Sequence, residues 1–131
     1  MGCGFSDEQW RTELEAAELQ LFKEGGVDLE KLTRKYTTIN MEGKELQVRT
    51  IIYNDDKTKK TLLMTHGYGM SAVITSFLLL TTLAEHYRIV VFDHGGWGLN
   101  TKVQETNALS SPEASEAYMV EWWHQLIETM V

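Results

Sequence analysis

The sequence predicts an α/β fold that contains a parallel pair of strands joined by a helix. Two short apolar runs, 61–65 and 88–92, have the pattern of buried parallel strands, and a helical pattern lies between them. The first run ends in His66-Gly67-Tyr68-Gly69, and the second is followed by Asp93. Because α/β folds place their chemistry at the carboxyl ends of such strands, both endings are candidate functional sites.

The composition fits one ordinary globular domain. The chain has 131 residues, of which 43% are hydrophobic and 24% are charged. Its longest apolar run, Phe77 to Leu80, is far shorter than the roughly 20 residues that a membrane-spanning helix needs. The single cysteine excludes an internal disulfide and a cysteine-based zinc site. We therefore expect an intracellular protein, without a metal site or a cofactor.

The net charge of −7 is unevenly distributed along the chain. It amounts to −6 over residues 1–30, +4 over residues 31–102 and −5 over residues 103–131. The sequence has no basic stripe with interleaved aromatic residues, so we expect no nucleic-acid partner.

The first element should be a helix that begins after Ser6 and ends at Gly25-Gly26. Ser6 can cap it, with Gln9 completing a capping box. The apolar residues at helical spacing are Trp10, Leu14, Ala17 and Leu21. This pattern favours an amphipathic helix packed on the domain. The alternative is a helix that lies on a membrane surface, but its acidic polar face argues against that location.

Two β-rich segments follow, at 35–40 and 46–53, and residues 41–45 between them have the composition of a hairpin connection. A polar turn at 54–57 leads into the apolar strand 61–65. The sequence thus predicts an antiparallel hairpin before the parallel pair.

The helix between the two apolar strands should run from Ser71 to His86. Ser71 fits the N-cap position, and the expected apolar face comprises Val73, Ile74, Phe77, Leu78, Leu80 and Leu83. After the strand 88–92 and a loop over 94–111, a last helix begins at Pro112, since proline is favoured at the first helical position. Its expected buried residues are Tyr118, Met119, Trp122, Leu126, Ile127 and Met130.

The two strand endings together resemble the α/β-hydrolase superfamily in its N-terminal half. His66-Gly67-Tyr68-Gly69 is similar to the turn after that fold's third strand. The segment 92–100, with Asp93, Gly96 and Gly98, is similar to its Asp-x-x-Gly-x-Gly-x-Ser loop, although Asn100 stands where serine is common. The resemblance covers residues 35–131. The segment 118–126 also resembles the branch that contains the lipid-droplet lipase coactivator and the N-acyl phospholipid lipases.

The resemblance implies an oxyanion hole, in which backbone N–H groups stabilise the negative charge that acyl transfer builds on a carbonyl oxygen. One donor maps onto the N–H of Tyr68, and the glycines at 67 and 69 let the backbone bend there. His66 would support this loop rather than act as the base. The second donor normally follows a nucleophile in Gly-x-Ser-x-Gly, and this chain contains no such segment.

The implied fold is an incomplete sheet, ordered so that the fourth strand lies beside the second and leaves the third exposed. The chain would divide into 1–34, an acylation signal and amphipathic helix, and 35–131, a partial α/β-hydrolase domain. The edge strand 61–65 contains no charged residue, so we expect self-association or a polypeptide partner there.

Other interpretations of these glycine-rich turns are weaker. His94-Gly95-Gly96-Trp97-Gly98 imitates the His-Gly-Gly-Gly oxyanion loop of another esterase branch, but it follows the fourth strand. Neither nucleotide-binding glycine motif is present. Ser71 could be a nucleophile, yet it lies six residues past Thr65 rather than on the strand-to-helix turn.

The amino terminus carries a separate signal. Met1-Gly2-Cys3-Gly4-Phe5-Ser6 fits the N-myristoylation pattern, with Cys3 beside Gly2 for palmitoylation. Two acyl chains would anchor the protein stably to membrane lipid, on the cytoplasmic face.

Two functional hypotheses result. The first is a truncated or split α/β-hydrolase-like protein, related to serine ester and lipid hydrolases and inactive as this chain alone. The alternative is a membrane-tethered, non-catalytic interaction module.

Overall fold

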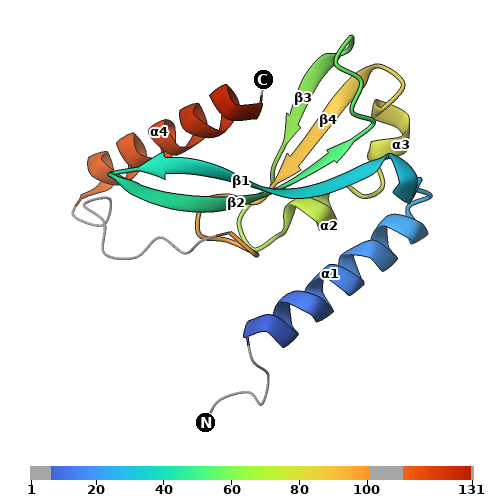
Figure 1. The fold of residues 1–131 in the computed structure, drawn as a ribbon, viewed down its shortest axis with the longest axis horizontal. Helices are drawn as coiled ribbons and strands as arrows, with labels where there is room; N and C mark the ends of the chain where they lie inside the picture. The colour runs from blue at the N-terminus through green and yellow to red at the C-terminus, as the bar shows by residue number, and fades with distance from the viewer. Residues whose placement is uncertain (1–6, 101–110, 131) are drawn as a thin grey trace.

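Four strands form one mixed sheet in the order β1-β2-β4-β3, with helices on both of its faces (Figure 1). The computed structural model describes residues 7–100 and 111–130. The elements in chain order are α1 (Asp7–Glu24), the short 3₁₀ helix η1 (Leu29–Lys31), β1 (Leu32–Met41), β2 (Lys44–Tyr53), β3 (Lys60–Met64), α2 (Ala72–Ser76), α3 (Leu80–Leu83), β4 (Tyr87–Phe92) and α4 (Pro112–Met130).

The pairing confirms the predicted α/β class and strand order. β1 pairs antiparallel with β2, β2 antiparallel with β4, and β3 parallel with β4. In the parallel pair Leu62 lies opposite Ile89 and Met64 opposite Val91. β3 is the last strand in the order, so its second edge has no neighbour among the described strands.

The hairpin is longer and its turn tighter than the sequence predicted. β1 and β2 have ten residues each, and only Glu42 and Gly43 separate them. Both residues have positive φ, 51° and 75°, as a two-residue type I′ turn requires. The right-handed twist of such a turn matches the strands, so pairing continues to the turn.

The strands alternate their side chains between two hydrophobic clusters, one on each face of the sheet. Ile52, Val90 and Phe92 face α4. Ile51, Ile89 and Val91 face the other way, toward Phe22 of α1 and the helices α2 and α3. The sheet is thus covered on both sides, as the apolar sequences of β2 and β4 require.

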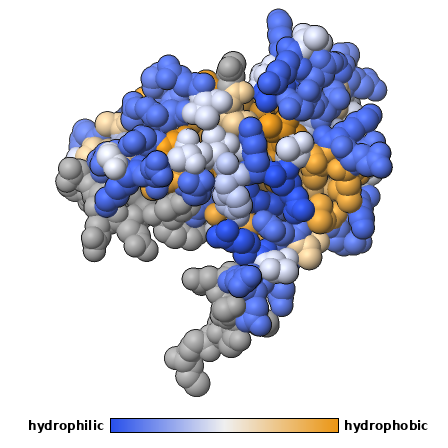
Figure 2. All heavy atoms as spheres, viewed as in Figure 1, coloured by the Kyte–Doolittle hydropathy of each residue, from blue (hydrophilic) through white to orange (hydrophobic). Residues whose placement is uncertain are grey.

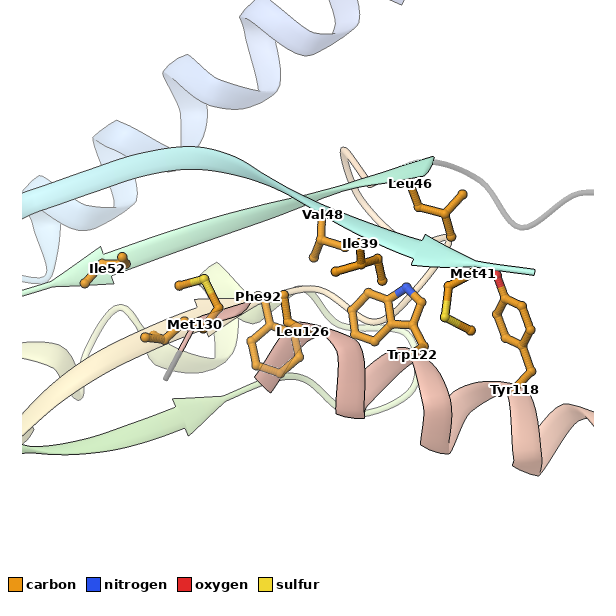
Figure 3. Packing of buried hydrophobic residues seen from close by; sticks show 11 residues of the cluster. Ile39, Met41, Leu46, Val48, Ile52, Phe92, Tyr118, Trp122, Leu126 and Met130 are labelled. Atoms are coloured by element: carbon orange, nitrogen blue, oxygen red, sulfur yellow. The ribbon is translucent and has the colours of Figure 1, made fainter. Parts of the chain in front are cut away.

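α4 covers the first face as predicted. Tyr118, Trp122, Leu126 and Met130 are buried at helical spacing against the sheet, and Figure 3 shows them directed toward the side chains of β1, β2 and β4. Ile127 is 36% exposed, so its predicted burial is wrong. It lies one position beyond Leu126, outside the stripe that meets the sheet.

α1 buries side chains against the domain only in its C-terminal half, and its N-terminal end projects away from the sheet (Figure 1). Nearer that end, Arg11 lies over the ring of Tyr36 in β1, 5.3 Å from the ring centroid. The predicted apolar face is therefore wrong in part, since Trp10 is 52% and Leu14 is 39% exposed. The residues that are buried are Glu18 and Phe22. Ser6, the predicted cap, lies outside the described residues.

The predicted single helix over 71–86 is two short helices, α2 and α3, with a turn at 77–79. Ser71 caps α2 as predicted, its Oγ accepting from the N–H of Ile74 at 3.2 Å. The hydroxyls of Thr75 and Ser76 donate to carbonyls four residues earlier, a pattern that bends helices. Leu78 is consequently 65% exposed rather than buried.

Hydrophilic residues cover most of the face viewed in Figure 2, including the end of the molecule that carries the turn between β2 and β3. Within residues 7–100 and 111–130, no helix is long and apolar enough to cross a bilayer.

Candidate functional site

The turns that follow β3 and β4 meet at the carboxyl ends of these two strands. β3 and β4 are parallel neighbours in register, so their carboxyl ends lie side by side. This brings together the predicted segments His66–Gly69 and Asp93–Asn100, which are separated in the sequence by α2, α3 and β4. We call them the first and second turn.

His66 fixes the first turn through both ring nitrogens. Its side chain is buried, and its Nδ1 lies 2.8 Å from the carbonyl oxygen of Gly67. Its Nε2 lies 3.1 Å from the backbone nitrogen of His94, whose N–H donates to it. A neutral ring protonated on Nδ1 satisfies both bonds. His66 thus holds the turn and has no ring nitrogen free for a general base.

The side chain of His94 forms a hydrogen bond back to the first turn. Its Nε2–H donates to the carbonyl oxygen of His66 at 2.9 Å, and the two imidazoles pack edge to face with centroids 4.7 Å apart. Trp123 of α4 lies beyond, 5.7 Å from the His94 ring. The two turns are therefore joined by reciprocal histidine–backbone hydrogen bonds.

Asp93 ties the second turn to the start of α2. Its Oδ1 accepts from the N–H of Ala72 at 2.8 Å and lies 3.6 Å from His66 Nε2, too far for a hydrogen bond. Gly98 packs against its other oxygen. A Cβ at Gly98 would overlap Asp93 Oδ2, and the residue has φ +57°. Gly96 also has positive φ, +82°. Glycine at 98 is required on both steric grounds.

Asn100 has a structural role that the sequence did not predict. It is buried, and its Nδ2 donates to the carbonyls of Asp93 at 2.8 Å and His94 at 3.1 Å. Its Oδ1 accepts from the backbone N–H of Arg49 in β2 at 2.7 Å. Asparagine supplies two donors and an acceptor in one plane, so it bridges the loop and the sheet where a serine could make fewer bonds.

The Arg49 side chain forms a buried ion pair with Glu18 of α1, next to this bridge. Burial raises the pKa of the Glu18 carboxyl, and the charge and hydrogen bond of Arg49 oppose that shift. The pair joins α1 to β2. The two residues are too far apart in the sequence for a local pattern to predict the contact.

Tyr68 presents the open part of the site. The N–H of Met70 bonds to the carbonyl of Gly67 at 3.2 Å, which places Tyr68 and Gly69 at the centre of a tight turn. Gly69 has φ +75°, the conformation that favours glycine at the third position of a type II turn. Tyr68 is 95% exposed, and its N–H forms no hydrogen bond within the described part of the chain.

Of the remaining predicted site residues, Gly67 belongs to the first turn, and a Cβ there would meet nothing within 4 Å. Ser71 is occupied as a cap. Gly2 and Cys3 lie outside the described residues. Over residues 7–100 and 111–130, no three His, Cys, Asp or Glu side chains are grouped to hold a metal ion.

Chemically, the carboxyl ends of β3 and β4 offer a rigid backbone turn on which the N–H of Tyr68 is not hydrogen-bonded to a described residue. The described residues supply no serine paired with a free histidine base. The arrangement suits stabilisation of negative charge on a bound oxygen rather than a complete nucleophilic mechanism.

Comparison with known proteins identifies a sequence relative. A stretch of 74 residues, 56% of this chain, is 30% identical to a protein of Oryza sativa subsp. japonica named probable 1-acylglycerol-3-phosphate O-acyltransferase, and it covers 17% of that protein. No protein-family model matches the chain.

Solved structures of hydrolases share the fold. A candidate lipase from Acinetobacter baumannii matches with a TM-score of 0.59 and 19% identity, over 98% of this chain and 36% of its own. A bacterial membrane phospholipase A matches with 0.53 and 17%, over 89% and 33%. A haloalkane dehalogenase from Agrobacterium tumefaciens matches with 0.51 and 18%, over 79% and 31%.

The chain thus spans 17% of the rice protein and about a third of each of these solved chains. The part of the chain that matches has four strands in the order β1-β2-β4-β3, with the parallel pair at the edge. The chain has the fold of the N-terminal part of an α/β-hydrolase.

Proposed function

We propose that this chain is the N-terminal part of an acyl-ester-processing α/β-hydrolase-like protein and contributes one half of its oxyanion hole. The observation that carries the proposal is the unbonded N–H of Tyr68 on a turn held rigid by His66, His94 and Asn100.

Rigidity is what makes such a donor useful. An N–H already fixed in place needs no reorganisation when charge develops, and one oxyanion donor is worth roughly 3–4 kcal/mol of transition-state stabilisation. Water could compete for the Tyr68 N–H, since the residue is 95% exposed. A covering polypeptide would exclude that water and strengthen the interaction.

The substrate class that we propose is an acyl lipid. The names of the relatives support it, since the rice protein is named as an acyltransferase of acylglycerol phosphate and two solved structures are named as a phospholipase and a lipase. The exposed aromatic residues Tyr68 and Trp97, whose rings lie 6.0 Å apart, would suit an apolar acyl chain beside the turn.

The proposal predicts that the isolated chain does not hydrolyse esters. Purified chain treated with a fluorophosphonate, which labels activated serines, should show no more label than heat-denatured chain. Ser71→Ala is the matched variant, because Ser71 starts a helix beside the turn. Labelling of the native chain that this variant abolishes would show an active nucleophile and contradict the proposal.

Sequencing the transcript beyond codon 131 is a second, independent test of the same proposal. We expect an in-frame strand followed by Gly-x-Ser-x-Gly, since the second donor and the nucleophile come from that segment. A continuing frame without such an elbow would contradict a serine hydrolase.

The second candidate is a membrane-tethered, non-catalytic interaction module. It is favoured by α1, which projects from the sheet with Trp10 and Leu14 exposed (Figure 1). Acylation at Gly2 and Cys3 would hold this helix near the cytoplasmic face of a membrane.

Fractionation of cells that express an N-myristoyltransferase tests the anchoring. Gly2→Ala should abolish membrane recovery because it removes the acylated amine, and Cys3→Ser should weaken it. Gly4→Ala is the control, since position 4 is unconstrained in the pattern, and it should behave as wild type. Equal recovery of all four forms would refute lipid anchoring.

A further inference from the structure

An open hollow of about 640 Å³ lies at the amino end of β3, beside the last turn of α4. Five of its lining residues are cationic, Lys35, Lys57, Lys59, Lys60 and Arg88. β3 runs about 13 Å from Lys60 to Met64 at the rise of a parallel strand, and the first turn lies past its far end. The hollow is therefore separate from the candidate oxyanion site.

The positive charge of the hollow is only partly balanced by its surroundings. Arg88 is buried, its Nε donates to Asp55, and its Nη1 lies 3.4 Å from the carbonyl of Met130 at the end of α4. Lys59 Nζ donates to the carbonyl of Ala84 at 2.9 Å. These contacts anchor two of the cations in place.

Lys35, Lys57 and Lys60 are exposed, and their ammonium groups form no hydrogen bond or ion pair with a described residue. Asp55 cancels one of the five charges, and the negative end of the α4 dipole cancels about half of another. The carboxylate of Asp56 interacts with Lys59 and offsets part of a third charge. An excess of about two to three positive charges is left, in a chain whose net charge is −7.

The pKa of the Asp55 carboxyl reflects this positive charge. Its pKa is held below the ordinary value, first by the hydrogen bond from Arg88 and then by the charges of Arg88, Lys57 and Lys35. The three cationic side chains thus act on one region of space, although they come from three segments of the chain: β1, the turn between β2 and β3, and β4.

We propose that the hollow binds a phosphate monoester group. A dianion with several acceptor oxygens fits converging lysines, which are compact charges that bind phosphate from several directions. The hydroxyl of Thr61 lines the same space and can donate to it. Leu63 and Met130 add apolar surface on which the organic part of the ligand would lie.

A single-stranded nucleic acid fits this hollow less well. Such strands are bound along grooves in which aromatic side chains stack on the bases. No aromatic side chain is among the described residues that line the hollow.

The test is calorimetric titration of the full chain with inorganic phosphate and with glycerol 3-phosphate, with amide NMR shifts recorded at Lys57 and Lys60. We expect saturable binding with a Kd of about 1 mM or tighter. The double variant Lys57→Ala/Lys60→Ala should bind about tenfold more weakly or worse, because each lysine adds an attractive charge. Neither residue is buried, so folding should be kept and is checked by the NMR spectrum.

The matched control is Lys23→Ala/Lys44→Ala, which removes the same charge from exposed positions outside the hollow. It should stay within about twofold of wild type, since distant exposed charges are screened by salt. Equal weakening by both double variants would show diffuse attraction and overturn the proposal.

Vesicles distinguish the two sources of the phosphate group. Phosphatidylcholine vesicles containing phosphatidic acid are compared with charge-matched vesicles containing phosphatidylglycerol, whose phosphate is a diester. Binding to phosphatidic acid that the double variant loses, with weak binding of soluble phosphate, would assign the site to a lipid head group. Binding of soluble phosphates alone would assign it to a small molecule.

Three further outcomes would overturn the proposal. They are no saturable binding to any phosphate monoester, equal binding to both anionic vesicles, and binding of a single-stranded oligonucleotide that exceeds that of glycerol 3-phosphate. None of these measurements depends on whether the Tyr68 turn takes part in ester chemistry.

Discussion

Gly98 and Asp93 illustrate how tightly the second turn is packed. The backbone of Gly98 lies so close to the Asp93 carboxylate that a methyl group would overlap its Oδ2. Asp93 in turn holds Ala72 at the start of α2. A change at this glycine therefore disturbs a loop and a helix together.

Gly98→Ala should lower the free energy of unfolding by at least about 1 kcal/mol, because the left-handed backbone alone costs roughly 1–2 kcal/mol for a residue with a Cβ. Urea denaturation measures the difference. Gly67→Ala is the control, since its φ is not in the left-handed region and its Cβ would meet nothing. Equal losses for the two variants would contradict the packing of Asp93 against Gly98.

Glu18 makes the stability of α1's attachment depend on pH. Its folded-state pKa is raised by burial above the ordinary 4.5, so the folded state binds this proton more tightly than the unfolded chain. The stability from that proton is fully present below pH 4.5 and is lost as pH rises through the raised pKa.

Glu18→Gln removes this contribution. The free energy of unfolding of wild type minus that of the variant should fall as pH rises above about 4.5. Urea denaturation across this range gives the difference. Glu13→Gln, at an exposed position of the same helix, controls for the loss of one carboxylate. A difference that rises with pH, or that does not change, would be inconsistent with a carboxyl whose pKa burial has raised.

At this scale the sequence could select His66, Asp93 and Gly98, because they stand in a recognisable order after two strands. It could not assign the bridging role of Asn100 or the pairing of Glu18 with Arg49. Those contacts join residues 51 and 31 positions apart, and a local pattern carries no information about them.

Among the elements, α4 and the strands were the most predictable. Their apolar residues recur at one period, and the buried set Tyr118, Trp122, Leu126 and Met130 follows it. The segment 71–86 was less predictable, because its apolar residues form a broad face that is compatible with one continuous helix. The end of α2 at Ser76 depends on hydrogen bonds from side-chain hydroxyls, which the apolar pattern does not indicate.

The packing of α4 can be measured by Leu126→Ala, which should cost about 2–5 kcal/mol of unfolding free energy, as for other fully buried leucines. Leu126 is 1% exposed in the cluster of Figure 3. Val120→Ala, at a position 65% exposed on the same helix, should change stability by less than about 0.5 kcal/mol. Similar urea midpoints for the two variants would mean that α4 does not pack on the sheet as described.

For the whole molecule, the open edge of β3 matters most. The order of the four strands in the sheet was predictable from the family resemblance. Composition and periodicity alone could not predict which strands are neighbours. Residues 61–64 are half-buried beside this edge and carry no charge that would block another strand; the one charged residue of β3 is Lys60, at its start. We therefore propose that β3 pairs with a second copy or with a polypeptide that supplies further strands.

Amide hydrogen exchange along β3, recorded at several micromolar concentrations with light scattering on the same samples, tests this edge. In the monomer, amides of residues 61–64 that face away from β4 should exchange quickly while those of Ile89 to Val91 stay protected. Protection of β3 and the scattering mass should rise together with concentration. A monomer at every concentration with strong protection along all of 61–64 would show that the sheet is already closed, and would contradict an N-terminal hydrolase portion with an open edge.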